Sequence, residues 1–413
     1  MRRLRTPSIL GAMIAGVLVL SSTPALAEVS IAVGPALLEL EGRPGDVGHI
    51  AITVSENGSD PVDIVTGLTD LTGMVGDHSA VAWSTVSPVR ASLQPGDDVT
   101  LDYQVAIPDD APSGGRYATI TITTAPPGGP DASVDPSAST MLGRIEVPVF
   151  LTVLGDEDLV RRPVAIERTA LFLGSDGTLS VVADVSNGGN VHVPLTGRAT
   201  VTQPTAASSP EPSASPLAQT GFPMGRVLPE TTRTLVAGDV LTLPLDKPYD
   251  LTVEMGPPTD DDPSAMREVI ASTTQQVIAT ASMTVSSIDL CQTADGGHLV
   301  TVSLVNDGGL GLTPDVALDL LDATGQSVAN ARVTVQAPAW PGATVTALGQ
   351  VPPGMPDGTW SLVAQATYGE GLTAELAAPF VVGGSPDAPA ACPGPEASPA
   401  ASPAPSPSAS PAG

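Results

Sequence analysis

The chain has 413 residues and a formal net charge of −28 at pH 7, with 16 basic against 44 acidic side chains. This surplus of negative charge argues against nucleic acid and against anionic membrane surfaces as partners. The 42 glycines and 43 prolines break helices and punctuate short strands, so they favour an all-β fold, and the length suffices for several cores of ordinary size.

The N-terminus, residues 1–27, has the features of a signal peptide. Three arginines within the first five residues precede an apolar run over 9–20, and Ala25-Leu26-Ala27 fits the small-residue cleavage pattern. We therefore expect an exported protein, extracellular or in the cell envelope, whose mature chain begins at Glu28 and has no membrane span. An uncleaved N-terminal anchor is the alternative.

A turn motif recurs three times and divides the chain. Each copy has a β-branched run, then an asparagine followed within two residues by a glycine, then a proline that opens a second apolar run; the copies centre on Asn57, Asn187 and Asn306. Their spacing of roughly 120 residues is that of a domain. With short β-rich runs between turns, it predicts three tandem immunoglobulin-like β-sandwiches over 28–155, 160–283 and 284–383.

The second copy of the motif supplies candidate binding residues, namely Asn187, Asn190 and His192. Asparagine and glycine reach positive φ at little cost, so the same residues also suit a tight turn between two strands. The recurrence of this chemistry in three modules favours the structural turn over a ligand-binding loop.

Within the modules, alternation of apolar and polar residues predicts strands with one buried face. The clearest examples in the first module are 50–54, 99–107 and 145–153. In the second module, a low-complexity loop over 203–221 interrupts the strands. Beyond the third module, residues 384–413 are rich in proline, alanine and serine, so we expect a disordered tail.

Two turns of similar sequence place an aromatic residue at the start of a strand. The first leads to Tyr117 and the second to Trp360, each preceded by two prolines and a glycine. The simpler interpretation is an aromatic side chain that fills the core beside the turn. Stacking of these rings on a sugar is the alternative, and it makes both residues candidates for binding.

The two cysteines, Cys291 and Cys392, are an even number in a chain with an export signal, which predicts a disulfide. The first lies in the opening strand of the third module and the second just past its last strand. Such strands often lie close together in sandwiches. Two free thiols are the alternative.

No catalytic or cofactor-binding motif is present, so we predict a non-enzymatic protein without a cofactor or a metal. The four histidines are scattered and have no partner at ligand spacing. The run Asp260-Asp261-Asp262 could hold Ca²⁺, which needs six to eight oxygen ligands, but three adjacent aspartates in a loop are more often simply solvated.

Several of these turns resemble those in the immunoglobulin-like domains of bacterial cell-surface proteins. The turns at Pro44-Gly45 and Pro95 and the strand entry at Tyr117 are similar to the peptidoglycan-binding-type domain of WxL-interacting proteins. The segments 187–192 and 227–229 are similar to the domain that follows it in such proteins. The resemblance implies a cell-wall polymer, peptidoglycan, or another surface protein as partner. The chain departs from that family in lacking a C-terminal membrane helix and a basic tail.

Periplasmic pilus chaperones share this fold and offer an alternative function. In them the alternating closing strand, here 145–153, captures a client subunit by β-strand addition. Arg116 and Arg144 are the nearby candidates for their basic cleft. The third module and the tail do not fit this alternative.

Overall fold

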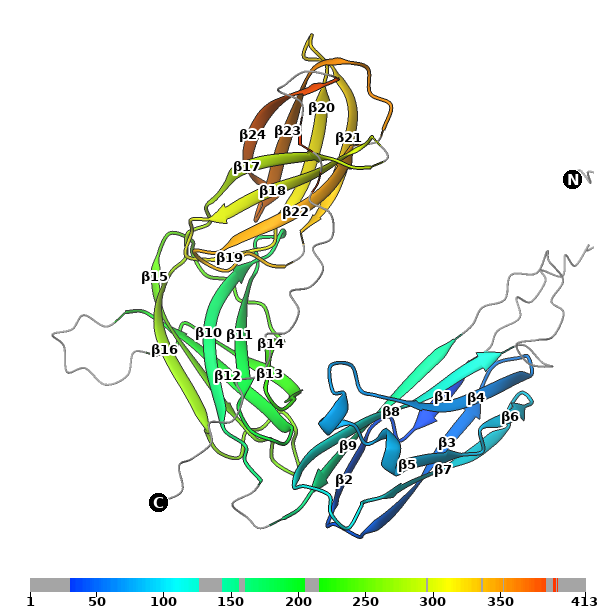
Figure 1. Cartoon of the computed structure of the whole chain (residues 1–413). Coiled ribbons are helices and arrows are strands. Elements are labelled where there is room, and N and C mark those ends of the chain that lie inside the picture. The colour runs from blue at the N-terminus through cyan, green and yellow to red at the C-terminus, as the bar shows by residue number, and fades with distance from the viewer. Residues whose placement is uncertain are drawn as a thin grey trace, which may run out of the picture. The chain divides into compact units, whose positions relative to one another are not determined.

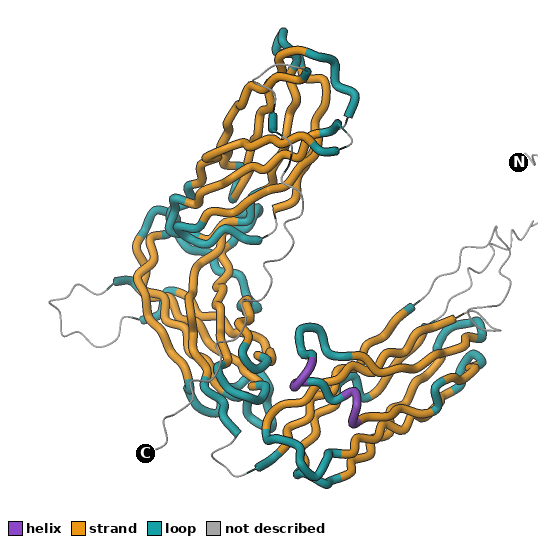
Figure 2. Tube along the Cα trace, in the orientation of Figure 1, coloured by secondary structure: helices purple, strands orange, loops and turns teal. Residues whose placement is uncertain are grey.

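The computed structural model describes residues 30–125, 143–155, 160–204, 215–294, 296–335, 337–351, 353–383, 389–390 and 392. The chain divides into two compact units, Met1–Leu159 and Val160–Gly413 (Figure 1). Strands dominate both, and two short 3₁₀ turns, Gly76–His78 and Val81–Trp83, are the helical segments within the described ranges (Figure 2). The predicted signal peptide and nearly all of the predicted tail lie outside the described residues. No described helix is long and apolar enough to cross a membrane.

The first unit is a β-sandwich of two sheets. Its strands are β1 (Ile31–Gly34), β2 (Leu38–Gly42), β3 (Val47–Glu56), β4 (Val62–Thr69), β5 (Ser84–Ser87), β6 (Arg90–Leu93), β7 (Asp98–Ala106), β8 (Gly114–Ala125) and β9 (Arg144–Val153). One sheet has the order β1-β3-β7-β5 and the other β2-β9-β8-β4-β6. Alternate residues of β3 and β7, such as Ile52, Val54, Leu101 and Tyr103, fill the core between them.

The strand predicted over 145–153 exists as β9, but it is not a free edge. Its C-terminal half pairs in parallel with β2, from Leu38↔Val149 to Gly42↔Val153. Its other side pairs along its whole length with β8. Only Arg144–Pro148 lacks a second neighbour among the described strands. The sequence pattern could not show this, because the alternation of a strand is the same at an edge and in the interior of a half-buried sheet.

The second sandwich, in the second unit, is also built from two sheets. Its strands are β10 (Val164–Leu173), β11 (Leu179–Asn187), β12 (Val193–Thr202), β13 (Ala218–Val227), β14 (Thr231–Val236), β15 (Pro248–Gly256) and β16 (Ala271–Ile278). The sheet orders are β14-β11-β10-β19 and β13-β12-β15-β16. Because β13 begins at Ala218, the connecting loop ends earlier than the predicted 203–221.

The third sandwich repeats this arrangement with one difference. Its strands are β17 (Met283–Gln292), β18 (His298–Asn306), β19 (Gly311–Leu312), β20 (Asp315–Leu321), β21 (Ser327–Val335), β22 (Thr344–Val351), β23 (Gly358–Tyr368) and β24 (Leu372–Val382). They form one sheet in the order β17-β18-β22-β21-β20-β23-β24, because β21 pairs with β20 and, at its end, with β22. The short β19 instead joins the sheet of the second sandwich.

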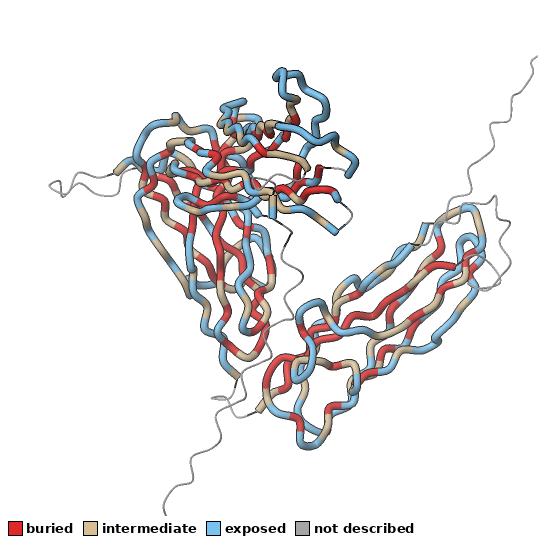
Figure 3. The backbone as a smooth tube through the Cα atoms, turned by 45° about the horizontal axis from the view of Figure 1, so that its top comes forward, coloured by how far each residue is buried: buried red, intermediate tan, exposed pale blue. Residues whose placement is uncertain are grey.

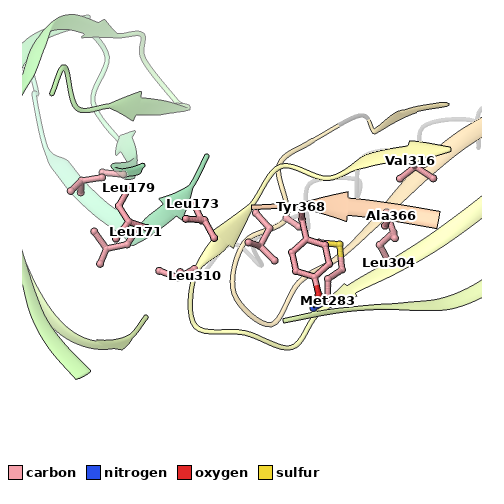
Figure 4. Close-up of a cluster of buried hydrophobic side chains, with 14 of the residues drawn as sticks. Leu171, Leu173, Leu179, Met283, Leu304, Leu310, Val316, Ala366 and Tyr368 are labelled. Carbon is pink, nitrogen blue, oxygen red and sulfur yellow. Dashed lines mark hydrogen bonds between the residues drawn. The ribbon is translucent and has the colours of Figure 1, made fainter. Parts of the chain in front are cut away.

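The second and third sandwiches share a single hydrophobic core. β19 pairs in parallel with β10, with Phe172 opposite Gly311 and Leu173 opposite Leu312. Leu171 and Leu173 of β10 belong to the same buried cluster as Leu310 and Tyr368 of the third sandwich (Figure 4). Figure 3 marks buried, intermediate and exposed positions along the backbone, and on strands such as β3 exposed positions alternate with less exposed ones. The shared core makes the two sandwiches one body, whereas the first sandwich has a core of its own.

Candidate functional site

The predicted candidate Asn187 ends β11 and is buried with all its amide groups in use. Its Nδ2 donates to the carbonyls of Val191 (2.8 Å) and Val227 (2.9 Å), and its Oδ1 accepts from the N–H of Gly189 (2.9 Å). A buried amide that satisfies main-chain groups in this way holds a turn together. The geometry therefore supports the structural turn, and a role for Asn187 in ligand binding stays a prediction.

The same arrangement recurs at Asn306, the last residue of β18. Its Nδ2 donates to the carbonyls of Leu310 and Ala339, both at 2.8 Å, and its Oδ1 accepts from the N–H of Gly308 at 3.0 Å. The repeat seen in the sequence is thus reproduced atom by atom in the second and third sandwiches.

In the first sandwich the equivalent residue is Glu56 rather than Asn57. Glu56 ends β3, is fully buried, and accepts at Oε1 from the N–H groups of Ser30 (3.2 Å) and Gly58 (2.5 Å). Asn57 is exposed. The sequence alignment of the three motifs is therefore off by one residue in this module, because matching by residue type placed asparagine on asparagine.

A second recurring turn braces each of these residues. The main-chain carbonyls of Glu56, Asn187 and Asn306 accept from the N–H of Gly96 (2.8 Å), Glu230 (2.8 Å) and Gly342 (2.9 Å). Each donor follows a proline and has positive φ, at 85°, 56° and 73°. Proline followed by a residue at positive φ is typical of a type II turn, for which glycine is the favoured residue.

The other candidates of the Asn187 turn are also engaged in the fold. The Oδ1 of Asn190 accepts from the N–H of Arg161 at 2.9 Å, and its own N–H donates to the Arg161 carbonyl at 3.1 Å. Gly189 approaches that carbonyl so closely that a Cβ there would lie 2.1 Å from it. His192 is buried. The turn thus clamps the segment that enters the second sandwich.

The aromatic candidates lie where a core-filling side chain is expected. Tyr117 is fully buried, and its ring packs edge-on against Phe150 at 5.7 Å between centroids. Trp360 is half-buried and donates its indole N–H to the carbonyl of Pro356 at 3.1 Å, which closes the preceding turn. The sugar-stacking alternative for these two rings stays a prediction.

The predicted disulfide is confirmed: Cys291 and Cys392 are bonded, 101 residues apart in sequence. Main-chain hydrogen bonds flank it, from the N–H of Gln292 to the Ala390 carbonyl (2.8 Å) and from the N–H of Cys392 to the Gln292 carbonyl (2.9 Å). The covalent loop therefore encloses almost the whole third sandwich.

The acidic run does not gather into a metal site. Asp260 pairs with Arg267 at 2.6 Å. Asp262 accepts from the hydroxyl of Ser264, and that hydrogen bond lowers the pKa of Asp262. No group of three or more histidine, cysteine, aspartate or glutamate side chains in the described part of the chain is placed to hold a metal.

The arginines considered for a basic cleft are likewise committed elsewhere. Arg116 is buried, donates to the carbonyl of Gly115 at 2.8 Å and lies over the Trp83 ring at 5.4 Å. Burial lowers the pKa of Arg116, and nearby Asp77 opposes that shift. Arg144 is exposed and pairs with Glu146 at 3.0 Å.

The strongest candidate for a binding site is a groove that sequence reasoning missed, at the junction of the second and third sandwiches. Its volume is about 700 Å³, within the range of small-molecule sites. Four segments line it: 168–170 of β10, 275–280 from β16 onward, the turn 307–309, and the turn 340–343. The last two are the recurring turns of the third sandwich, so the groove exists only because that sandwich docks on the second.

One wall of the groove carries a stack of charged and aromatic groups. The Arg168 guanidinium lies 3.9 Å above the centroid of Trp340, whose ring packs edge-on against Phe172 at 5.1 Å. Buried Asp184 fixes the arginine through Nε at 2.6 Å. Arg168 keeps half its side chain exposed, so its remaining N–H groups can meet a ligand that enters the groove.

The opposite wall is the edge strand β16. The side chains of Gln276 and Ile278 are exposed, and Ile278 is 55% exposed although it is apolar. Asp307 adds an exposed carboxylate at the end of the groove. The surface is thus mixed, with an arginine, a carboxylate, amides and a few apolar groups. Such a lining suits a polar polymer or a peptide better than a purely apolar ligand.

Comparison with known proteins identifies no family. No protein-family model matches the chain, and no curated protein matches it. Among solved structures, it is similar to the YadV chaperone, with 10% identity and a TM-score of 0.32 over 60% of this chain and 99% of that chain.

Two further chaperone structures are similar at the same level. The CupB2 chaperone of Pseudomonas aeruginosa is 11% identical, with a TM-score of 0.31 over 59% of this chain and 98% of that one. A structure of the SafA pilin with the SafB chaperone of Salmonella enterica is 15% identical, with a TM-score of 0.31 over 62% and 98%. Likeness this distant carries no argument about what this chain binds.

Proposed function

We propose that the chain is an exported, non-catalytic binding or scaffold protein of the bacterial cell envelope, and that its ligand site is the groove between the second and third sandwiches. The observation that supports this most is the groove itself. It is built on a shared core and is bordered by exposed Arg168, the exposed amide of Gln276 and the edge strand β16.

The use of the buried polar groups supports a binding rather than a catalytic role. Asn187, Asn306 and Arg116 bond to main-chain carbonyls, and Asp184 bonds to Arg168 and Thr234. A catalytic group needs reach toward a reacting atom and a pKa suited to proton transfer or attack. These groups instead stabilise turns and the wall of the groove.

The partner that fits the proposed compartment is a cell-wall polymer, peptidoglycan, or another surface protein. Peptidoglycan carries sugar hydroxyls, amides and carboxylates, and the groove presents Arg168, Gln276 and main-chain groups that can pair with them. The strongly negative chain makes a highly anionic wall polymer a poor partner unless a cation bridges the two.

Sedimentation of residues 28–413 with purified peptidoglycan tests this proposal, with and without Ca²⁺ and at two salt concentrations. We expect retention in the pellet that survives the higher salt. Ile278→Glu, which places a charge on the wall of the groove, should reduce retention. Val328→Glu, at a similarly exposed apolar residue of β21, should not. No retention under any condition, or equal retention of both variants, would reject wall binding through the groove.

A second candidate function is client capture by β-strand addition at the free half of β9. The observation that favours it is that no described strand pairs with the outer side of Arg144–Pro148, the part of β9 before its pairing with β2 begins. A photo-crosslinking residue at exposed Glu146 tests it. Crosslinks to added extended peptides at Glu146, and none from the same residue at exposed Glu39 of β2, would favour this function over the groove.

A further inference from the structure

The edge strand β16 directs unpaired main-chain groups toward the groove. The N–H of Ala279 donates to the Lys247 carbonyl on the β15 side, at 2.9 Å. In an antiparallel ladder, residues that exchange hydrogen bonds with the neighbouring strand alternate with residues that do not. The main-chain N–H and C=O groups therefore point toward β15 at residues 271, 273, 275 and 277 of β16. They point away from β15 at Ser272, Thr274 and Gln276.

A side-chain contact supports this assignment. Thr274 lies opposite Thr252 of β15, and their hydroxyls are 2.9 Å apart. Residues that face each other without exchanging main-chain bonds bring their side chains closest, as these two do. Among the described strands, β15 is the sole partner of β16. No described strand bonds to the outward main-chain groups, although β10 of the other sheet lies close to β16 and accepts a hydrogen bond from Gln275.

The molecule fills comparable edges elsewhere with its own chain. In the first sandwich, β9 is the last strand and follows β8, as β16 follows β15 in the second; β2 adds to its outer edge in parallel over five residue pairs. In the second sandwich, β19 adds in parallel to β10 at Phe172 and Leu173. The outer edge of β16 has no such partner among the described residues, although it borders the groove that β19 helps to form.

The opposite wall does not offer an equivalent edge. The Nε2 of Gln275 donates to the carbonyl of Thr169 at 2.5 Å, so a side chain already occupies the outward carbonyl of β10 beside the groove. The open edge of β16 also has a defined end, because the Ile278 carbonyl accepts from Thr280 and crowds Gly309. The free stretch is therefore Ser272–Gln276.

We propose that an extended peptide of a partner protein adds as a strand to the outer edge of β16 along Ser272–Gln276. Main-chain hydrogen bonds to Ser272, Thr274 and Gln276 supply the affinity, and alternate side chains of the peptide enter the groove toward Ala170 and Arg168. The proposal rests on the proposed function, since it takes the groove as the ligand site and names its ligand class. The addition is parallel, as it is for β2 and β19.

Binding of synthetic peptides to residues 28–413 tests the proposal. Peptides of about ten residues, the upper length of a typical strand, are selected from a random displayed library, and the best binder is then N-methylated one residue at a time. An added strand turns every second N–H toward β16. We expect methylation to weaken binding about tenfold or more at alternate residues and to have little effect between them. Uniform effects, or none, would overturn strand addition.

A matched pair of proline variants locates the binding edge. Gln276→Pro removes an outward N–H and should weaken peptide binding about tenfold or more, while the bonds between β15 and β16 are kept. Thr232→Pro changes an exposed residue of β14, on the other side of the same sandwich, and should leave binding unchanged. Equal affinity of Gln276→Pro and the parent chain would overturn the proposal.

Two further experiments distinguish a partner peptide from a segment of this chain, and strand addition from wall binding. Peptide binding that appears only after deletion of residues 205–214 or 393–413 would show that the chain fills its own edge, and would overturn a partner peptide. Peptidoglycan sedimentation of Gln276→Pro is measured alongside. Undiminished wall retention together with failed peptide selection would overturn strand addition and keep the proposed function. If neither the parent chain nor Gln276→Pro is retained with peptidoglycan, wall binding is rejected. The peptide-binding measurements then decide strand addition alone.

Discussion

The second and third sandwiches have similar strand arrangements. The turn after the second strand is the same in both, whereas the ends of the two sandwiches differ. Asn187 and Asn306 make the same three hydrogen bonds in the two copies. Elsewhere the copies diverge. His298 opens β18 where Leu179 opens β11, Gly342 takes the turn position of Glu230, and a disulfide closes the third copy alone.

The difference indicates which parts of the fold are obligatory. The turn at the end of the second strand buries main-chain groups, and a buried side chain bonds to them in each case: an amide in these two copies and the Glu56 carboxylate in the first sandwich. The positions that differ lie at strand beginnings, at exposed turns and at the end of the module, where several solutions are possible.

The disulfide should contribute the largest difference between the copies. Replacing both Cys291 and Cys392 by serine releases a loop of about 100 residues, which in the chain-entropy model costs about 4–5 kcal/mol of unfolding free energy. Denaturant unfolding of the oxidised parent, the reduced parent and the double variant measures it. Reduced parent and double variant should coincide at a lower midpoint. An unchanged midpoint would mean that the third copy is held by packing alone, as the second is.

The paired asparagines should be equivalent. Asn187→Ala and Asn306→Ala each remove two donors and one acceptor from buried main-chain groups, at an expected cost of about 3 kcal/mol in unfolding free energy. Asn57→Ala in the first sandwich, at the exposed asparagine that sequence matching aligned with them, should cost less than about 0.5 kcal/mol. Urea unfolding of the three variants decides the matter. A cost for Asn57→Ala equal to the others would contradict the assignment of Glu56 as the equivalent residue.

The type II turns should respond in opposite directions to glycine exchange. Glu230 has φ of 56°, a conformation that costs a residue with a Cβ about 1 kcal/mol relative to glycine. Glu230→Gly should therefore raise the unfolding free energy by about 1 kcal/mol, and Gly342→Ala, at φ of 73°, should lower it by a similar amount. Thermal unfolding of the two variants is the measurement. A loss of stability in Glu230→Gly would show that the Glu230 side chain contributes more than the turn conformation costs.

His298 should give the third copy a small pH dependence of its stability. Burial lowers the pKa of His298, so the unfolded chain binds the proton more readily than the folded chain. Stability should fall as pH drops below about 6.5, the ordinary histidine value. His298→Leu, the residue type at Leu179, should remove this loss of stability between pH 7 and 5. Parallel pH profiles for His298→Leu and the parent would refute the assignment.

Much of the fold could be predicted because its signals are local. Alternation along 50–54 and 99–107 specifies strands with one buried face, and those strands are β3 and β7. The cysteine pair needed only its count and its place at the first and last strands of a module. The candidate site could not be predicted in the same way. Asn187 and Asn190 hold a turn, and Tyr117 lies in the core. No sequence signal indicated the groove. None of its lining residues, such as Gln276 or Trp340, belongs to a recognisable motif.

The sequence by itself determined an all-β chain of three sandwiches, their repeated turns and the bond between Cys291 and Cys392. These follow from residue periodicity and from the backbone angles that proline, glycine and asparagine allow, which act over a few residues. Only the tertiary structure decided that Glu56 replaces Asn57 in the first turn, that β2 covers half of β9, and that β19 fuses two sandwiches beside an open β16. Those outcomes depend on which distant strands meet, and local patterning does not encode strand neighbours.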